Sequence, residues 1–178
     1  LHLLSRRQRQ MCIRDRYLGC EFHANMSMVE TLINKERPTM AGSDYVLTEF
    51  SGATDFAFAR ERVYELVTHG FIPIIAHVER YPNIRKDMGN LETLREIGAY
   101  LQVNAESILG EEGFATKRFC KKLMKNNMLD FVGTDCHRTN KRIPNLGPCA
   151  EYMEKKMGRE YTERILIHNP QKIIENIG

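Results

Sequence analysis

The chain lacks paired cysteines and long apolar runs. Its 178 residues hold five cysteines, an odd number without paired spacing, at positions 12, 20, 120, 136 and 149. No apolar run approaches the roughly 20 residues that a membrane-spanning helix needs. These absences argue against a disulfide framework and a membrane span, and the length suits one domain with a hydrophobic core. We therefore expect a protein of the reducing cytoplasm.

Excess charge is confined to the start of the chain. The whole sequence carries +3, but residues 1–20 hold five Arg and one Asp, a charge of +4, so the rest carries −1. Nothing in that near-neutral body requires nucleic acid as a partner. The Arg-rich run of residues 1–16 has no helical or strand period and looks like translated sequencing-adapter DNA. We interpret residues 1–16 as a non-native or disordered segment and residues 17–178 as the domain; a nucleic-acid or membrane-surface tether is the alternative.

Apolar and amphipathic stretches alternate through the rest of the chain. The apolar stretches predict strands at 17–21, 45–50, 72–77, 100–104 and 129–134. The amphipathic stretches predict helices at 27–38, 54–69, 90–97 (capped by Asn90), 115–126 and 149–157, then two helical turns that are broken at Asn169-Pro170. This alternation predicts an α/β fold with a parallel sheet. Because a closed barrel needs more strands, we expect an incomplete one.

Several predicted strands end in an acidic residue or a histidine. Since the carboxyl ends of parallel strands meet at one edge of a sheet, these side chains are expected to converge there. Mixed carboxylate and imidazole ligands suit Mn, Zn or Fe, and carboxylate-rich sites can bridge two ions. The candidate metal ligands are Glu21, Glu49, His77, Asp135 and His137.

Two arginines follow the candidate ligands closely. Arg80 lies three residues after His77, and Arg142 lies five residues after His137. Guanidinium groups match the nonbridging oxygens of a phosphate, and paired metal ions can activate water for phosphoryl transfer. The combination predicts hydrolysis of a phosphate ester.

A cysteine-based mechanism is the alternative within the same segment. Cys136 and Arg142 are separated by five residues, the spacing of cysteine-dependent phosphatases. The five residues between them are bulky, however, and Pro144 follows instead of a helix that would cradle the phosphate. Taken one at a time, His77 also fits a buried structural histidine and Asp135 a turn residue.

Five short motifs carry a resemblance to a known family across residues 17–178. They are Gly19-Cys-Glu21, Val46-Leu-Thr-Glu-Phe50, Ile75-Ala-His-Val-Glu-Arg-Tyr-Pro82, Leu101-Gln-Val-Asn-Ala105 and Thr134-Asp-Cys-His137 with Arg142-Ile-Pro144. Together they resemble the PHP-type (polymerase and histidinol phosphatase) protein-tyrosine phosphatases. These are the CpsB/CapC-like enzymes of bacterial capsule and exopolysaccharide loci.

The resemblance implies a distorted (β/α)7 TIM-like barrel with two to three divalent ions, usually Mn2+, with Fe or Zn as alternatives. It implies a metal-bound hydroxide as nucleophile and a phosphotyrosine protein as substrate, namely a bacterial tyrosine kinase. By position, Glu21 resembles the acid that bridges metals, and the arginines resemble those that hold phosphate. The residues that match further metal ligands are Glu49, His77, Asp135 and His137.

The chain also departs from that family. The family opens with a His-x-His strand and later carries a Pro-His-His segment, and neither is present here. Glu106 stands where the family usually has glycine. We therefore expect a barrel without its first strand–helix units, lacking several metal ligands and having weak or no activity. A histidinol-phosphatase-like enzyme and a non-catalytic metal-binding remnant remain as other hypotheses.

Overall fold

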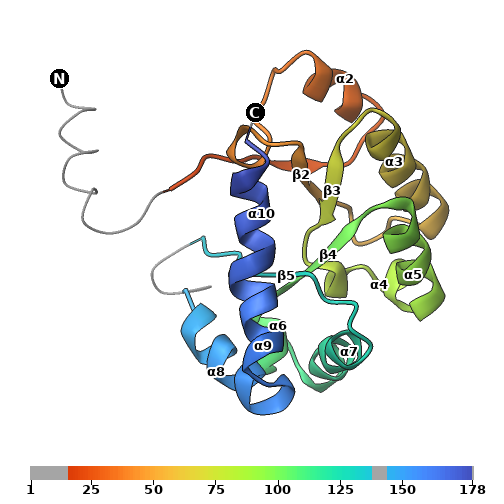
Figure 1. Ribbon diagram of the computed structural model, residues 1–178. Helices are drawn as coiled ribbons and strands as arrows, with labels where there is room; N and C mark the ends of the chain where they lie inside the picture. The colour runs from red at the N-terminus through yellow and green to blue at the C-terminus, as the bar shows by residue number, and fades with distance from the viewer. Residues whose placement is uncertain (1–15, 138–143, 178) are drawn as a thin grey trace.

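The computed structural model describes residues 16–137 and 144–177, which form a parallel sheet covered by helices (Figure 1). All neighbouring strands are parallel and pair in chain order. The strands are β1 (Glu21–His23), β2 (Tyr45–Glu49), β3 (Ile72–Ile75), β4 (Tyr100–Asn104) and β5 (Phe131–Gly133). Each strand is followed by at least one helix, as the alternating pattern predicted.

The helical elements run between the strands and on to the C-terminus. The α-helices are α2 (Met28–Ile33), α3 (Phe56–Thr68), α4 (Pro82–Arg85), α5 (Met88–Ile97), α6 (Ala105–Leu109), α7 (Phe114–Lys125), α8 (Leu146–Met157), α9 (Arg159–Glu163) and α10 (Asn169–Glu175). Two 3-10 turns, η1 (Met40–Gly42) and η2 (Val78–Arg80), and a π-helical turn, η3 (Arg164–His168), complete the chain. Among the described residues, every helix is too short or too polar to span a bilayer.

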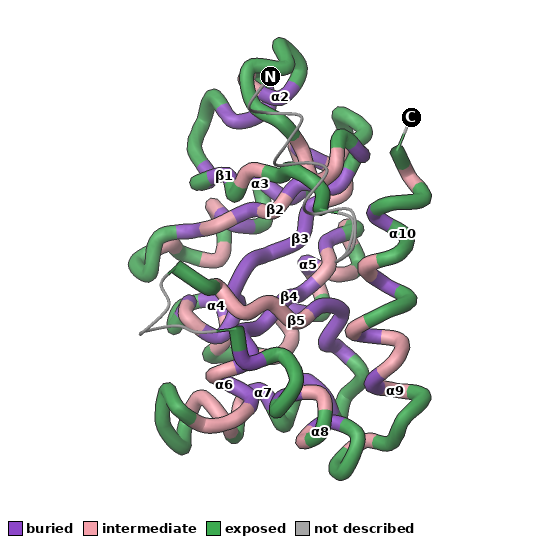
Figure 2. Tube along the Cα trace, turned by 90° about the vertical axis from the view of Figure 1, so that its left-hand side faces the viewer, coloured by how far each residue is buried: buried purple, intermediate pink, exposed green. Residues whose placement is uncertain are grey.

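Side chains that alternate along the strands divide the core between the two faces of the sheet. On one face, Val46, Ile75 and Leu101 join the main core with the helices that connect the strands. On the other face, a smaller cluster joins the sheet to Ile173 of α10. The central strands β3 and β4 are therefore almost continuously buried (Figure 2). A rigid, buried centre fixes the positions of the residues that follow these strands.

The expected barrel is not confirmed, because the sheet is open. Strands β1 and β5 are its two ends, and within the described residues they do not pair with each other. Five strands are too few to curl into a closed cylinder, for which about eight are usual. The predicted first strand, 17–21, is also displaced: pairing with β2 begins only at Glu21.

Two predicted helix boundaries were wrong. Helix α5 begins at Met88, before the predicted cap Asn90; the Asp87 side chain caps it by accepting a hydrogen bond from Gly89 N–H at 2.9 Å. The C-terminal helices do not break at Asn169-Pro170, since α9, η3 and α10 follow one another directly. Pro170 lies at the start of α10, where the wider π-helical turn before it tolerates a residue without an N–H.

Candidate metal and phosphate site

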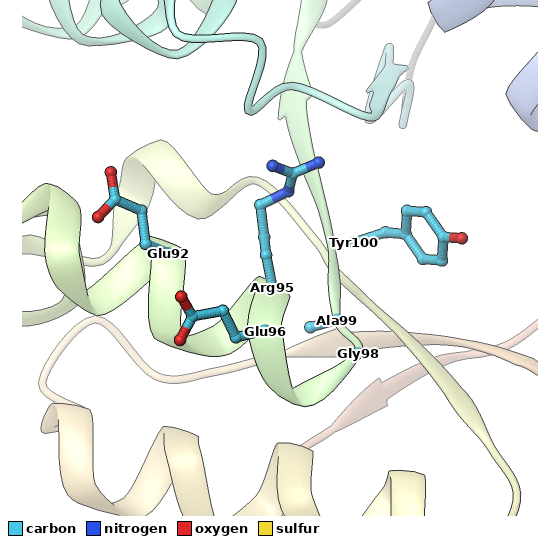
Figure 3. Close-up of a pocket in the computed structure, with 6 residues that line it drawn as sticks. All are labelled: Glu92, Arg95, Glu96, Gly98, Ala99 and Tyr100. Carbon is cyan, nitrogen blue, oxygen red and sulfur yellow. The ribbon is translucent and has the colours of Figure 1, made fainter.

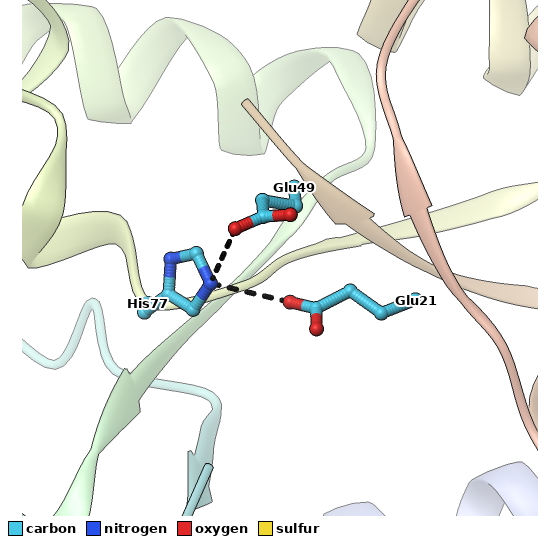
Figure 4. Close-up of side chains that lie close together, drawn as sticks. All are labelled: Glu21, Glu49 and His77. Atoms are coloured by element: carbon cyan, nitrogen blue, oxygen red, sulfur yellow. Dashed lines mark ion pairs between the residues drawn. The ribbon is translucent and has the colours of Figure 1, made fainter. Parts of the chain in front are cut away.

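Three of the predicted ligands meet at the carboxyl edge of the sheet. The Nε2 atom of His77 lies 3.2 Å from Glu21 Oε1 and 3.4 Å from Glu49 Oε1 (Figure 4). One ligand atom from each of the three residues can be chosen so that all lie within 4.8 Å of one another. Two carboxylates and one imidazole at this spacing fit a divalent cation, with coordination positions left for other ligands. His23 lies beside them, with Nδ1 3.7 Å from Glu49 Oε2.

The strands position these side chains through their register. Glu21 begins the short strand β1 instead of ending it as predicted, and it is in register with Leu47 of β2. Glu49 lies two residues after Leu47 at the end of β2, so Glu21 and Glu49 project from the same face of the sheet. His77 follows β3 in a left-handed conformation, with φ 33°. Its backbone N–H donates to Gln102 Oε1 at 2.5 Å, which holds this strained turn against β4.

Tyr81 fixes the imidazole from the opposite side. Its hydroxyl lies 3.0 Å from His77 Nδ1 and accepts a hydrogen bond from Phe50 N–H at 3.0 Å. Tyr81 is 1% exposed, and burial raises its pKa, so the phenol stays protonated. With Nδ1 held by Tyr81, Nε2 is directed at the two glutamates and is the nitrogen available to a metal.

The charge around His77 attracts cations. Burial lowers the pKa of His77, but the hydrogen bond with Glu21 and the charges of Glu21 and Glu49 outweigh that effect, and the net shift is upward. The two carboxylates therefore make the imidazole bind its proton more tightly than a solvent-exposed histidine would. A divalent cation would satisfy the same negative charge by replacing that proton.

Arg80 lies beside this cluster and is bound by three carboxylates. Its Nη1 donates to Asp135 Oδ2 at 2.8 Å, and its Nη2 donates to Glu112 Oε1 at 2.9 Å and Glu106 Oε1 at 3.2 Å. These partners raise the pKa of Arg80 further above its usual value, although burial acts in the opposite direction. The guanidinium that the sequence assigned to phosphate is therefore engaged by acidic side chains in this structure.

A shared hydroxyl connects two of the acidic groups near Arg80. Ser107 Oγ lies 2.8 Å from both Glu79 Oε1 and Glu112 Oε2. A hydroxyl has one proton to donate, so the second short contact requires a proton on one carboxyl group. Burial raises the pKa of Glu79, whereas at Glu112 hydrogen bonds from Arg80 and Ser107 outweigh burial and lower the pKa. A shared proton is therefore favoured on Glu79 over Glu112.

The other predicted site residues lie apart from the three-residue cluster. Asp135 follows β5 with φ 48° and faces Arg80, and His137 Nδ1 lies 3.2 Å from Asp135 Oδ1. Arg142 falls outside the described residues, as does most of the segment that would cradle phosphate beside the exposed Cys136. A cavity of about 290 Å³ nevertheless connects the two groups, since Glu21, His77 and Asp135 all line it.

A larger hollow lies at the opposite end of the sheet. It measures about 440 Å³ and is lined by Gly98, Ala99 and Tyr100 at the amino end of β4 and by three charged residues of α5 (Figure 3). Those charges are two glutamates and Arg95, which is already paired with Asp130 at 3.0 Å. The hollow therefore has no cation left for a phosphate, and the site at the carboxyl edge is the better candidate.

Comparison with known proteins identifies the family. The family model for capsular polysaccharide synthesis, CpsB/CapC, matches residues 2–175. The chain belongs to the CpsB/CapC family. It is 29% identical over 161 residues to tyrosine-protein phosphatase CpsB of Streptococcus pneumoniae, a match that covers 88% of this chain and 66% of that protein. It is 28% identical over 158 residues to tyrosine-protein phosphatase YwqE of Bacillus subtilis, covering 89% of this chain and 62% of that one.

The fold of the chain is also similar to that of CpsB/CapC relatives of known structure. A crystal structure from a study of YwqE and CpsB, described as unique metal-dependent tyrosine phosphatases, superposes with a TM-score of 0.88 at 26% identity. The match covers 99% of this chain and 72% of that chain. The chain thus spans about two thirds of the length of these CpsB/CapC relatives.

The sequence alone missed the residues that support the candidate site. Tyr81 stands four residues after His77, a spacing that could have indicated contact across a helical turn. Glu112 and Ser107 carry no such signal. The contact of Glu112 with Arg80, and that of Ser107 with Glu112, depend on how α6 and the following loop return to η2.

Replacing Tyr81 with phenylalanine should weaken metal binding about tenfold, because groups that orient a ligand typically contribute that much or more to affinity. The His77 ring would remain in place but lose the partner at Nδ1. Calorimetric titration with Mn2+ measures the change. Tyr64→Phe, at a side chain that is 61% exposed, is the matched control and should bind like the wild type.

Proposed function

We propose that the chain is a metal-dependent protein-tyrosine phosphatase that acts in capsular polysaccharide synthesis. The observation that carries this proposal is the convergence of Glu21, Glu49 and His77 within one ligand-sized space. Phosphatase names among the relatives of the CpsB/CapC family support the choice of reaction. The metal dependence described for the matching structures supports the role of the cluster.

Each side chain has a role in this proposal. Glu21, Glu49 and His77 would hold a divalent cation, for which we propose Mn2+, while Tyr81 keeps the imidazole oriented. The cation, when bound, would act as a Lewis acid and lower the pKa of a water molecule. We propose Asp135 and His137 as further ligands, since both follow β5 at the same edge of the sheet.

Arg80 would hold the phosphoryl group. Its two Nη atoms can donate to two nonbridging oxygens at once, in the geometry they now use for carboxylates. Substrate binding then requires the phosphate to displace Glu106 or Glu112 from Arg80 while Asp135 stays nearby. We propose Arg142 as the second phosphate-binding arginine, and a bacterial tyrosine kinase as the phosphorylated protein.

Phosphate release from a phosphotyrosine peptide tests the reaction. We expect Mn2+ to support release and EDTA to abolish it, because the carboxylate–imidazole cluster is where the metal would bind. The same assay with histidinol phosphate separates a protein phosphatase from an enzyme that acts on small esters. A second chain, in which the amino-terminal segment of S. pneumoniae CpsB precedes Tyr17, tests whether that segment raises the activity. If neither chain releases phosphate with any divalent metal, the proposed activity is wrong.

A further inference from the structure

A basic groove runs along α7. It has a volume of about 560 Å³, and every charged side chain that lines it is a cation. The exposed ring of Phe114 and the ring of Tyr152 on α8 also line it. Helix α7 itself contains no acidic residue. The five cations of the groove are Lys117, Arg118, Lys121, Lys122 and Lys125.

Most of this charge is not neutralised by the protein. Within residues 16–137 and 144–177, no carboxylate forms an ion pair with any of the five cations. Lys117 Nζ donates to Leu109 O at 2.7 Å and lies 5.0 Å from the centre of the Tyr152 ring, so it is fixed in place while keeping its charge. Unpaired cations along one concave surface produce a positive potential that attracts acidic partners.

The groove begins beside the candidate phosphatase site. Helix α7 connects the parallel strands β4 and β5, so it runs against them and its first residue lies at their carboxyl edge. Phe114, which is 81% exposed, comes two residues after Glu112, the residue bound to Arg80 at 2.9 Å. A chain with its phosphate on Arg80 can therefore continue directly past Phe114 into the groove.

We propose that this groove binds an acidic, extended segment next to the phosphotyrosine of the substrate protein; the proposal rests on the phosphatase function proposed above. Lys117, Lys121 and Lys125 are four residues apart on α7, so they rise about 6 Å per step along one side of the helix. Every second side chain of an extended peptide faces the same way, at a spacing of about 6.6 Å. Alternating Asp or Glu residues would thus meet successive lysines, with an apolar residue against Phe114.

A single-stranded nucleic acid fits the groove less well. Such strands bind by stacking bases on open aromatic faces as well as by charge. The face of Tyr152 nearest the groove is covered by Lys117, which leaves Phe114 as the exposed ring. A peptide needs the cations and one apolar contact, and the groove offers both.

Peptide binding in EDTA tests the groove without requiring catalysis. The probes are two fluorescein-labelled peptides that share an unphosphorylated tyrosine and carry either alternating glutamates or alternating glutamines. Fluorescence anisotropy should show about fivefold to tenfold tighter binding of the glutamate peptide, since several exposed charge pairs act together. The double variant Lys121→Glu/Lys125→Glu should remove the difference. The double variant Lys155→Glu/Lys156→Glu makes the same charge change on exposed residues of α8 outside the groove. This control should still bind the glutamate peptide more tightly than the glutamine peptide.

Turnover then connects the groove to the reaction. With phosphorylated versions of both peptides, Lys121→Glu/Lys125→Glu should lower kcat/KM for the acidic peptide alone, and hydrolysis of p-nitrophenyl phosphate should not change. If the wild-type chain binds the acidic peptide but hydrolyses neither phosphorylated peptide, the phosphatase proposal is wrong, whereas the peptide-binding role of the groove is still supported. Equal binding of the two peptides, or tighter binding of an oligonucleotide of equal charge, overturns the groove proposal even if the chain is an active phosphatase.

Discussion

Replacing His77 with glutamine is expected to lower Mn2+ affinity at least 100-fold and phosphotyrosine hydrolysis about 1000-fold. The affinity loss should exceed that of residues that merely orient ligands, because His77 supplies the only nitrogen in the cluster of described ligands. A loss of Lewis-acid stabilisation of about 4 kcal/mol corresponds to that rate factor. Calorimetric metal titration and steady-state kinetics measure the two effects separately.

The matched control for His77→Gln is His69→Gln. His69 is exposed at the end of α3, where its Nδ1 lies 2.8 Å from Glu65 O, far along the chain from either glutamate of the cluster. This variant should bind Mn2+ and hydrolyse substrate like the wild type. If His77→Gln binds Mn2+ with unchanged affinity, the cluster of Glu21, Glu49 and His77 is not the metal site.

Acidification should weaken Mn2+ binding to the wild type through the same residue. Glu21 and Glu49 raise the pKa of His77, so a proton competes with the metal at a higher pH than it would at a solvated histidine. The apparent affinity is therefore expected to fall as pH drops through that raised pKa. The stability of the metal-free protein should depend on pH in the opposite direction. The ion pairs of protonated His77 with Glu21 and Glu49 stabilise the fold at pH values below the pKa of His77, and this contribution is lost as the pH rises through that pKa.

The strands were predictable because their signal is local. The run Ile72–Ile75 is apolar throughout, as a strand covered on both faces should be. Tyr100–Asn104 is almost as completely buried, although it includes the polar side chains of Gln102 and Asn104. The open sheet follows from the same count of strands. The helix starts at Met88 and Asn169 were harder, because capping by Asp87 and the π-helical turn depend on neighbouring backbone geometry.

The acidic surroundings of Arg80 could not be predicted from spacing. The sequence showed an arginine three residues after a candidate ligand, and that pattern indicates phosphate binding as readily as a salt bridge. Left-handed backbone at His77 and Asp135 turns these side chains toward the same edge. Asp and His adopt this conformation more often than most residues, but too seldom for the residue type alone to predict it. Glu112 reaches Arg80 only because α6 ends at Leu109 and the next loop returns to η2.

Replacing Arg80 with methionine is expected to lower kcat/KM for a phosphotyrosine peptide at least 100-fold and to reduce the free energy of unfolding by about 2–3 kcal/mol. The first effect follows from the loss of a two-pronged phosphate donor. The second follows because Asp135, Glu106 and Glu112 would keep their negative charges close together without the cation that now joins them. This expected loss of stability is smaller than the loss on breaking a fully buried ion pair, because the Arg80 side chain is 26% exposed and solvent weakens its interactions.

Arg80→Lys separates the two roles of this residue. Lysine keeps the positive charge among the three carboxylates, so at least half of the lost stability should return in urea unfolding. It lacks the planar fork that reaches two phosphate oxygens together, so kcat/KM should stay close to that of the methionine variant. A lysine variant with wild-type turnover would show that Arg80 contributes charge alone. A methionine variant as stable as the wild type would show that the three carboxylates are kept apart by something other than Arg80.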